Sequence, residues 1–206
     1  MIEIFGHRHS PYTQRVLFFL EEIHKEYEFH PIKLEKKEHF KPYFRKLSLF
    51  QRVPVLKYGS LVLSESQAIL RYFAEKFQAF SYYPRNLELR ADIDQWMDHC
   101  SSHIGNHMTQ LAWEFHWKKK FGLKKSNEQI NRIVTKLEKE LPLIDCHLSN
   151  RTYLNQAKVS LADVSFLPLM LNSKLTDFSL EKYPFVRSWC DRMEARAAWQ
   201  KLAFYQ

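Results

Sequence analysis

Apolar residues follow two different spacings along the chain, and the spacing changes near residue 80. Before that point, short apolar runs that suit strands alternate with stretches whose apolar positions recur every three or four residues, as in helices. Strands are predicted over 2–5 and 27–33, a hairpin over 53–63, and helices over 11–25 and 66–77. The segment over 79–84 is predicted to be a linker.

Beyond the linker the apolar positions repeat with a helical period throughout. One stripe consists of Ile93, Trp96, Met97, Cys100, Ile104, Met108 and Leu111, and a second of Ile130, Ile133, Val134, Leu137, Leu141, Ile144 and Leu148. In the first part, the order β-α-β followed by β-β-α is the thioredoxin-like arrangement. The predicted fold is therefore a thioredoxin-like α/β domain over 1–78 followed by an all-helical domain over 86–206.

The composition is that of a well-packed globular protein. The 206 residues are 45% hydrophobic and include only 4 glycines, so there is ample material for a core and little for flexible linkers. No apolar run approaches the roughly 18 residues of a membrane span, and the first residues lack the pattern of a signal peptide. The 3 cysteines show no paired spacing, which suits a reducing compartment. We expect a cytoplasmic protein without a membrane partner.

The net charge of +8 is spread evenly over the two parts. Residues 1–81 hold 13 Lys and Arg against 9 Asp and Glu, and residues 82–206 hold 18 against 14, so each part carries +4. The local lysine run, Lys118-Lys119-Lys120 with Lys124-Lys125, is of a kind that usually marks a solvated helix end. We therefore expect no nucleic-acid partner and interpret the excess charge as attraction for a small anionic ligand.

The stretch from Val53 to Ser66 combines features of a peptide-binding site. Pro54 opens a strand without a backbone N–H to donate, which predicts a cis Val53–Pro54 bond that turns the Val53 backbone toward an extended peptide ligand. Ser66 falls at a helix N-terminus, where free N–H groups favour a carboxylate. Locally, the alternative is a plain hairpin whose proline only ends a loop.

Several motifs, spread over essentially the whole chain, resemble those of plant and bacterial glutathione S-transferases, especially the phi class. These motifs are Phe5-Gly6-His7 with Ser10, Thr13 and Arg15-Val16, the His39 position, Ser160-Leu161-Ala162-Asp163, Tyr183-Pro184-Phe185-Val186, Trp189, and Ala198-Trp199-Gln200-Lys201. The chain is identified as a serine-type, phi-like member, with a bacterial origin expected. In this family the Ser160-Leu161-Ala162-Asp163 pattern is a capping box that starts an apolar helix.

The resemblance implies that the Ser10 hydroxyl donates to the sulfur of bound glutathione. Taken alone, Ser10 before Pro11 predicts an ordinary helix N-cap. Because Ser10 and Thr13 stand where a glutaredoxin carries its two cysteines, dithiol exchange is excluded.

The family pattern also implies how the rest of glutathione is held. Glu65 and Ser66 bind the γ-glutamyl end, and Val53, next to Pro54, pairs with the cysteinyl backbone. His39 and Lys41 meet the glycyl carboxylate, where Arg52 departs from the phi pattern, which has Gln before Val-Pro. This glycyl subsite is where the sequence differs most from the family.

Three further assignments follow from family position or helical spacing. The pocket for a hydrophobic electrophile is assigned to Met108, Leu111, Ala112 and Phe115, although a helical apolar stripe is more often core. Phe50 stands where several classes insert an aromatic anchor into the partner of a homodimer, against the alternative that it packs on its own domain. His99, His103 and His107 recur every four residues, but no clear tetrahedral set completes them, so we expect no metal.

The resemblance implies a homodimeric, cytoplasmic glutathione transferase active in detoxification, with glutathione as co-substrate and a hydrophobic electrophile as its target. The alternatives are a glutathione-dependent peroxidase, isomerase or dehalogenase on the same scaffold, or a binding or regulatory protein without transferase activity. Ser10, Glu65 and Ser66 together argue for the enzyme.

Overall fold

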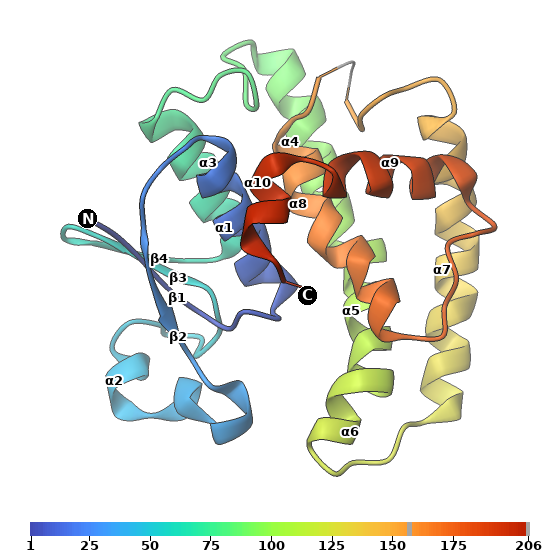
Figure 1. The fold of residues 1–206 in the computed structure, drawn as a ribbon, viewed down its shortest axis with the longest axis horizontal. Helices are drawn as coiled ribbons and strands as arrows, with labels where there is room; N and C mark the ends of the chain where they lie inside the picture. Colours follow the sequence, from blue (N-terminus) through green and yellow to red (C-terminus); the bar gives the residue numbers. More distant parts are fainter. Residues whose placement is uncertain (156–157, 205–206) are drawn as a thin grey trace. The chain divides into compact units, whose positions relative to one another are not determined.

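The computed structural model describes residues 1–155 and 158–204, which form two compact units. One unit comprises residues 1–80 with the C-terminal residues from 197, and the other comprises residues 81–196 (Figure 1). No helix in the described ranges is both long and apolar enough to cross a membrane. The change in apolar spacing near residue 80 therefore coincides with the start of the second unit.

The first unit is built on a four-stranded sheet with the order β2-β1-β3-β4. Its strands are β1 (Ile2–Gly6), β2 (Glu28–Pro31), β3 (Val55–Tyr58) and β4 (Leu61–Ser64). β1 runs parallel to β2, and the pairs β1–β3 and β3–β4 are antiparallel. This is the thioredoxin-like arrangement predicted from the sequence.

The helices of the first unit are α1 (Pro11–Glu22), the short α2 (Pro42–Arg45) and α3 (Ser66–Lys76), and α1 packs against α3. Two 3₁₀ turns, Leu34–Lys36 and Glu38–Phe40, connect β2 to α2. Alternate residues of β1 are buried, as expected for a strand with one face on the core. A core cluster of Ile32, Phe44 and Val55 ties the 3₁₀ segment and α2 to the sheet.

The C-terminal helix α10 (Ala197–Leu202) makes its contacts with α1, within the first unit. The Trp199 ring meets Phe18 edge-on with centroids 5.1 Å apart, and Lys201 Nζ donates to Glu21 Oε2 at 2.6 Å. The sequence placed these residues with the helical domain over 86–206. Periodicity does not reveal which surface a short helix covers, and here the covered surface is that of α1.

The second unit is helical, as predicted. It contains α4 (Leu87–Ser102), α5 (Ile104–Ala112), a π-helical turn (Trp113–Trp117), α6 (Lys118–Lys120), α7 (Asn127–Leu148), α8 (Leu161–Met170), a 3₁₀ turn (Leu171–Leu175) and α9 (Pro184–Glu194). Every residue of α8 is buried, and α8 packs against α4, α5 and α9. A helix that is apolar all round belongs in the core of such a bundle.

The first apolar stripe lies on two helices, although the sequence predicted one. The chain breaks between α4 and α5 at His103, whose φ and ψ are −112° and −101°. Gly105, the second residue of α5, lets the chain pass close to α8 directly after this break. A Cβ at Gly105 would lie 2.2 Å from the Cys100 carbonyl oxygen and 2.4 Å from Leu169 Cδ1, so only glycine allows this close approach to α8.

Candidate functional site

The strand register brings four loops to the same end of the sheet in the first unit. Phe5 near the end of β1 pairs with Val55 at the start of β3, and Val55 pairs with Ser64 at the end of β4. In the parallel pair, Gly6 lies opposite Pro31 at the end of β2. At this end of the sheet, the chain therefore leaves β1, β2 and β4 and enters β3. The four loops that meet the sheet here carry the residues predicted to bind glutathione.

Ser10 lies at the end of the β1–α1 loop and immediately precedes α1. Its backbone N–H donates to the His7 carbonyl at 2.9 Å, and its carbonyl accepts from the Thr13 and Gln14 N–H groups at 2.9 Å each. Its side chain makes no capping hydrogen bond to the helix. The local alternative, a serine whose hydroxyl caps α1, is therefore not what the structure has.

Two side-chain contacts hold the β1–α1 loop in place. Gln14 Nε2 donates to the Arg8 carbonyl at 3.1 Å, and the Arg8 guanidinium donates to the Leu202 carbonyl at 2.6 Å. Gly6 allows β1 to approach α1 closely, because a Cβ there would lie 2.4 Å from Thr13 Cγ2. Ser10 is thus presented on a loop that is fixed at both ends.

Glu65 and Ser66 stand where β4 passes into α3. Ser66 is the first residue of α3 and is buried, while Glu65 is exposed. Glu65 has φ of 71° and ψ of 106°, a conformation that residues with a Cβ rarely adopt. Such strained positions concentrate at functional sites, where the surrounding structure holds them. The free N–H groups of the first turn of α3 favour an anionic group here.

The Val53–Pro54 peptide bond is cis, which confirms the sequence prediction. Val53 is half-buried and Pro54 is buried, directly before β3. The side chain of Arg52 is exposed, and its backbone is held by Ser48, whose Oγ accepts from the Arg52 N–H at 3.3 Å and lies 3.4 Å from its carbonyl.

Sequence reasoning did not identify Ser48 as part of the site. It is almost fully buried and positions the segment that leads into the cis bond. A single serine in an irregular stretch carries no periodic signal, so nothing in the sequence distinguishes it.

His39 and Lys41 lie in the irregular segment that follows β2. His39 belongs to the 3₁₀ turn Glu38–Phe40 and is half-buried, and burial lowers its pKa below the usual value. Its Nδ1 atom is buried without a hydrogen-bond partner. Lys41 is exposed, and its Nζ lies 4.0 Å from Glu38 Oε1.

The four residues assigned to an electrophile pocket lie in the second unit. Met108, Leu111 and Ala112 are buried in α5, and Phe115 in the π-helical turn is half-buried. Leu111 and Phe115 line a pocket of about 360 Å³. Met108 and Ala112 are not among the residues that line it.

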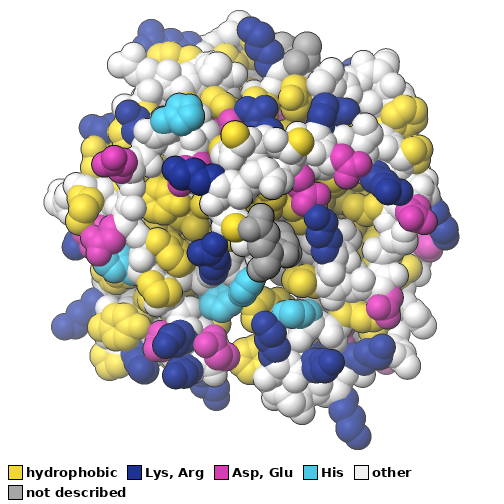
Figure 2. All heavy atoms as spheres, in the orientation of Figure 1, with side chains coloured by type: hydrophobic (Ala, Val, Ile, Leu, Met, Phe, Trp, Pro, Cys, Tyr) yellow, Lys and Arg dark blue, Asp and Glu magenta, His cyan; other side chains and the backbone are white. Residues whose placement is uncertain are grey.

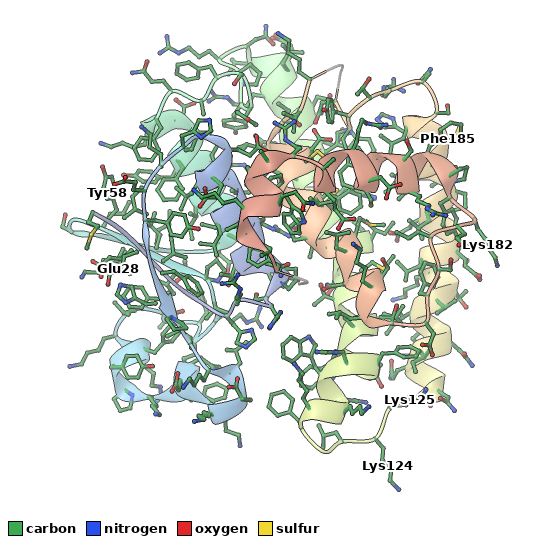
Figure 3. The ribbon with its side chains drawn as sticks, viewed as in Figure 1. Glu28, Tyr58, Lys124, Lys125, Lys182 and Phe185 are labelled. Carbon is green, nitrogen blue, oxygen red and sulfur yellow. The ribbon has the colours of Figure 1, made fainter. Side chains whose placement is uncertain are left out.

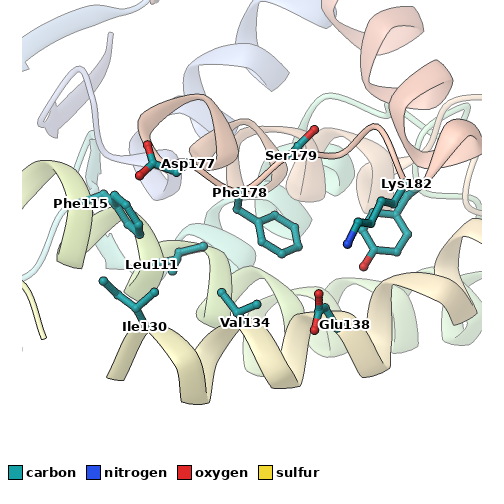
Figure 4. A pocket seen from close by; sticks show the side chains of 10 residues that line it. Leu111, Phe115, Ile130, Val134, Glu138, Asp177, Phe178, Ser179 and Lys182 are labelled. Carbon is teal, nitrogen blue, oxygen red and sulfur yellow. The ribbon is translucent and has the colours of Figure 1, made fainter. Parts of the chain in front are cut away.

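This pocket lies between α5, α7 and the segment that follows the 3₁₀ turn after α8 (Figure 4). Its other lining residues are Ile130, Val134, Glu138, Asp177, Phe178, Ser179, Lys182 and Tyr183. Most of the residues that line the pocket are apolar, and Glu138, Asp177 and Lys182 are the charged ones, as is usual for sites that bind small organic molecules.

Phe50 and its neighbour Leu49 are unusually exposed for large apolar side chains. They are 62% and 81% exposed in the loop between α2 and β3. Such an exposed pair is typical of a surface that another molecule covers.

The three histidines at four-residue intervals do not assemble a metal site. The described residues contain no group of three or more His, Cys, Asp or Glu side chains arranged to hold an ion. Instead, the His99 and His103 rings stack with centroids 4.8 Å apart, and His107 Nδ1 lies 3.8 Å from Glu140 Oε1.

Comparison with known proteins gives a consistent result over nearly the whole chain. Residues 1–75 match the model of the glutathione S-transferase N-terminal domain, and residues 104–197 match that of the C-terminal domain. A curated glutathione S-transferase of Silene vulgaris is 30% identical over 97% of this chain and 95% of its own length.

Solved structures agree with this result. The crystal structure of glutathione transferase F7 from Populus trichocarpa superposes with a TM-score of 0.92 at 29% identity, covering 98% of each chain. A glutathione S-transferase-I solved with lactoylglutathione gives a TM-score of 0.89 at 27% identity, also over 98% of each chain. The relatives named here by organism are plant proteins, so the expected bacterial origin has no support.

Proposed function

Because the chain belongs to the glutathione S-transferase family and is a glutathione transferase, we propose that Ser10 activates the thiol of bound glutathione. One observation carries this proposal: the Ser10 side chain makes no capping hydrogen bond to α1. Ser10 lies on the loop that leaves the end of β1, at the end of the sheet where the four loops meet. The hydroxyl donates to the sulfur and stabilises the thiolate, which then attacks an electrophilic carbon.

The energies involved are sufficient without a general base. A thiol with a pKa of about 8.5 is only a few per cent ionised at pH 7, and lowering the pKa to about 6.5 takes about 2.7 kcal/mol. A hydrogen bond to a charged group contributes roughly 1.5–3 kcal/mol. A helix N-terminus adds about 0.3–1 kcal/mol. The Ser10 hydroxyl supplies the hydrogen bond, and the N-terminus of α1 supplies the second contribution.

The surrounding loops orient the tripeptide. Ser66 and the first-turn N–H groups of α3 bind the γ-glutamyl carboxylate, and Glu65 binds the ammonium group. The Val53 backbone beside Pro54 pairs with the cysteinyl residue. The strained Glu65 backbone and the register that unites these loops support this arrangement.

The glycyl carboxylate is assigned to His39, Lys41 and Arg52. Each lies on a segment that leaves the same end of the sheet. Burial lowers the pKa of His39, so at neutral pH its imidazole acts as a neutral donor, and the two exposed cations supply the positive charge.

The hydrophobic electrophile is assigned to the helical residues Leu111 and Phe115, with Met108 and Ala112 buried on the same helix as Leu111. An apolar pocket next to Leu111 and Phe115 supports this assignment. We place the reaction in the cytoplasm as a detoxification step, in a homodimer anchored by Phe50, whose exposure supports a partner contact.

Retention on immobilised glutathione, followed by conjugation of a generic aryl halide, tests the proposal. The wild-type chain is expected to bind and to turn over. Glu65→Gln is expected to weaken glutathione binding about tenfold, since it removes one charge-assisted hydrogen bond.

Ser60→Ala, in the turn between β3 and β4, is the matched control and is expected to change nothing. If Glu65→Gln binds glutathione as tightly as the control, the assigned γ-glutamyl subsite is wrong. A wild-type chain that neither binds nor conjugates would overturn the catalytic role of Ser10.

A further inference from the structure

The turn between α6 and α7 carries a concentration of lysines that glutathione transfer does not use. We call the segment from residue 117 to residue 125 the basic tip. It contains Lys118, Lys119, Lys120, Lys124 and Lys125, with no acidic residue among them. Elsewhere on the face shown in Figure 2, basic and acidic side chains are interspersed.

Within residues 1–155 and 158–204, Lys118 is the one lysine of the basic tip that has a carboxylate partner. Its Nζ lies 2.8 Å from Glu114. For the other four, the described part of the chain provides no carboxylate within ion-pair distance. Lys120 Nζ lies 5.1 Å above the Trp117 ring and Lys125 Nζ 4.8 Å above the Phe115 ring. Figure 3 shows Lys124 extending away from the turn.

Glu114 gives the basic tip a defined shape. Its carboxylate is 7% exposed and accepts from both the Ser126 N–H at 2.7 Å and Lys118 Nζ at 2.8 Å, so it joins the two ends of the turn. Burial alone raises the pKa of Glu114, but the hydrogen bonds from Lys118 and Ser126 lower it overall. The carboxylate therefore stays charged at neutral pH and keeps the turn closed.

Apolar side chains are exposed within and beside the same turn. Leu123 is 54% exposed next to Gly122, whose φ of 68° provides the reversal of the chain. Trp113, 41% exposed, is tilted against Phe121 with centroids 5.7 Å apart. Lysines around exposed Leu and Trp side chains are the combination found in segments that lie at membrane interfaces.

Contrary to the expectation from the sequence of no membrane partner, we propose that the basic tip docks on membrane surfaces rich in anionic phospholipid, with the lysines against the headgroups and Leu123 entering the interface. Clusters of four or more such cations attract anionic lipid headgroups. Single-stranded nucleic acid is favoured less, because it needs aromatic faces free to stack on bases. Here Trp113 and Phe121 pack against each other, and the most exposed apolar side chain is a leucine.

The expected strength follows from the number of charges. Each lysine near an anionic surface contributes about 1 kcal/mol, which is about fivefold in the partition constant. Replacing Lys119, Lys120 and Lys124 by Gln is therefore expected to weaken binding about 100-fold. Lys125 is left in place because it contacts Phe115, which lines the pocket.

Co-sedimentation of the full chain with vesicles tests the proposal. Vesicles of phosphatidylcholine with about one-third phosphatidylserine are compared with pure phosphatidylcholine, at low and high salt. The matched control replaces Lys46, Lys136 and Lys139 by Gln, which removes the same charge from exposed positions elsewhere. The thermal midpoint of each variant verifies that it is folded.

We expect binding to the anionic vesicles only, lost at high salt because screening shortens the range of the attraction. The variant with Lys119, Lys120 and Lys124 replaced should lose binding to anionic vesicles. The control variant should keep nearly all of this binding. Leu123→Ser should weaken binding severalfold, whereas Leu87→Ser, at a leucine that is 73% exposed, should not.

Three results would overturn the proposal. In the first, the wild-type chain fails to bind anionic vesicles. In the second, both lysine variants lose binding equally, which shows general charge attraction. In the third result, a single-stranded oligonucleotide binds through the tip lysines while vesicles do not, which assigns the surface to nucleic acid. None of these outcomes bears on Ser10 or on glutathione binding.

Discussion

Two serines each precede a helix in this protein, and their side chains are used in opposite ways. Ser160 precedes α8 in a complete capping box, in which its N–H and its hydroxyl both lie 2.9 Å from Asp163 Oδ2. Ser10 precedes α1 and its side chain makes no capping bond. The Ser160 side chain is thus bonded to an acid of its own helix, whereas the Ser10 side chain makes no capping bond to α1.

The residue three positions later also differs between the two serines. Asp163 follows Ser160, and it also accepts from the Leu154 N–H and from Trp189 Nε1, at 2.9 Å each. Thr13 follows Ser10 and cannot act as a reciprocal acceptor of this kind; its side chain instead fills the space that Gly6 leaves open. The reciprocal bond of a capping box is therefore present at Ser160 and has no carboxylate to make it at Ser10.

The largest effect is expected for Asp163→Asn, which keeps the shape of the side chain. The amide replaces one accepting oxygen by a donor that faces the Ser160 N–H, and the buried groups around it lose their partner. We expect the free energy of unfolding to fall by roughly 3–5 kcal/mol, as for a broken buried network. Chemical denaturation of the two proteins measures this.

Asp145→Asn is the control, since Asp145 also accepts two backbone N–H groups, from Phe185 and Val186, but at an exposed helix start. It should cost only about 1 kcal/mol. Equal losses in the two variants would show that the buried network at Ser160 has no special weight.

Ser10→Ala is the second prediction and acts on chemistry instead of stability. We expect conjugation to fall about 100-fold, equivalent to about 2.7 kcal/mol, with glutathione affinity kept within a few-fold. Because the side chain makes no capping bond, the free energy of unfolding should change by less than about 0.5 kcal/mol. Steady-state kinetics and the thiolate absorbance of the bound complex are the measurements.

Ser160→Ala provides the opposite pattern. It should cost about 1 kcal/mol of stability and leave turnover by the folded protein unchanged. A Ser10→Ala variant that conjugates normally but unfolds more easily would make Ser10 a structural cap like Ser160.

Sequence patterns predicted the elements that depend on periodicity and failed where contacts between distant segments decide. The alternation in β1, the largely apolar α8 and the capping box at Ser160 are local, so they were predictable. The break at His103 is followed by the close approach of Gly105 to α8, and the placement of α10 depends on the surface of α1. Neither partner is close in sequence.

The candidate site divides in the same way. The prediction of a cis bond before β3 came from one proline and is confirmed. The role of Ser48 could not be predicted, because it acts through two hydrogen bonds to the Arg52 backbone in an irregular loop. The roles of the individual glutathione-binding residues stay predictions.

Phe50→Ala extends the comparison to an apolar group that its own chain leaves exposed. If Phe50 anchors a second copy, its truncation should weaken the dimer by about 2 kcal/mol per site, as for buried aromatic anchors. A two-fold interface uses the same patch on both chains, so the change counts twice. Sedimentation velocity over a range of micromolar concentrations measures the dissociation constant.

Phe185→Ala is the matched control, because Phe185 is also exposed, at 43%, at the start of α9. It should leave the association unchanged. A wild-type monomer would refute the dimer, and a dimer that Phe50→Ala does not weaken would refute only the anchor.

The smallest effect is expected for Gly6→Ala, which tests the close approach of β1 to the start of α1 at Thr13. The added methyl would meet Thr13 Cγ2 at 2.4 Å, so either β1 or the start of α1 must shift. We expect a loss of about 1 kcal/mol in stability, at the low end for an overpacked core, because the obstacle is a side-chain methyl and not backbone. In a Thr13→Ala background the same change should cost less, since Cγ2 and Oγ1 are gone and only the residue 13 Cβ, at 3.2 Å, remains close. A double-mutant cycle by chemical denaturation gives the coupling between the two positions. Coupling near zero between positions 6 and 13 would mean that their close approach does not fix Thr13. The position of Ser10 would then be held by other contacts of the loop, such as those of Arg8 and Gln14.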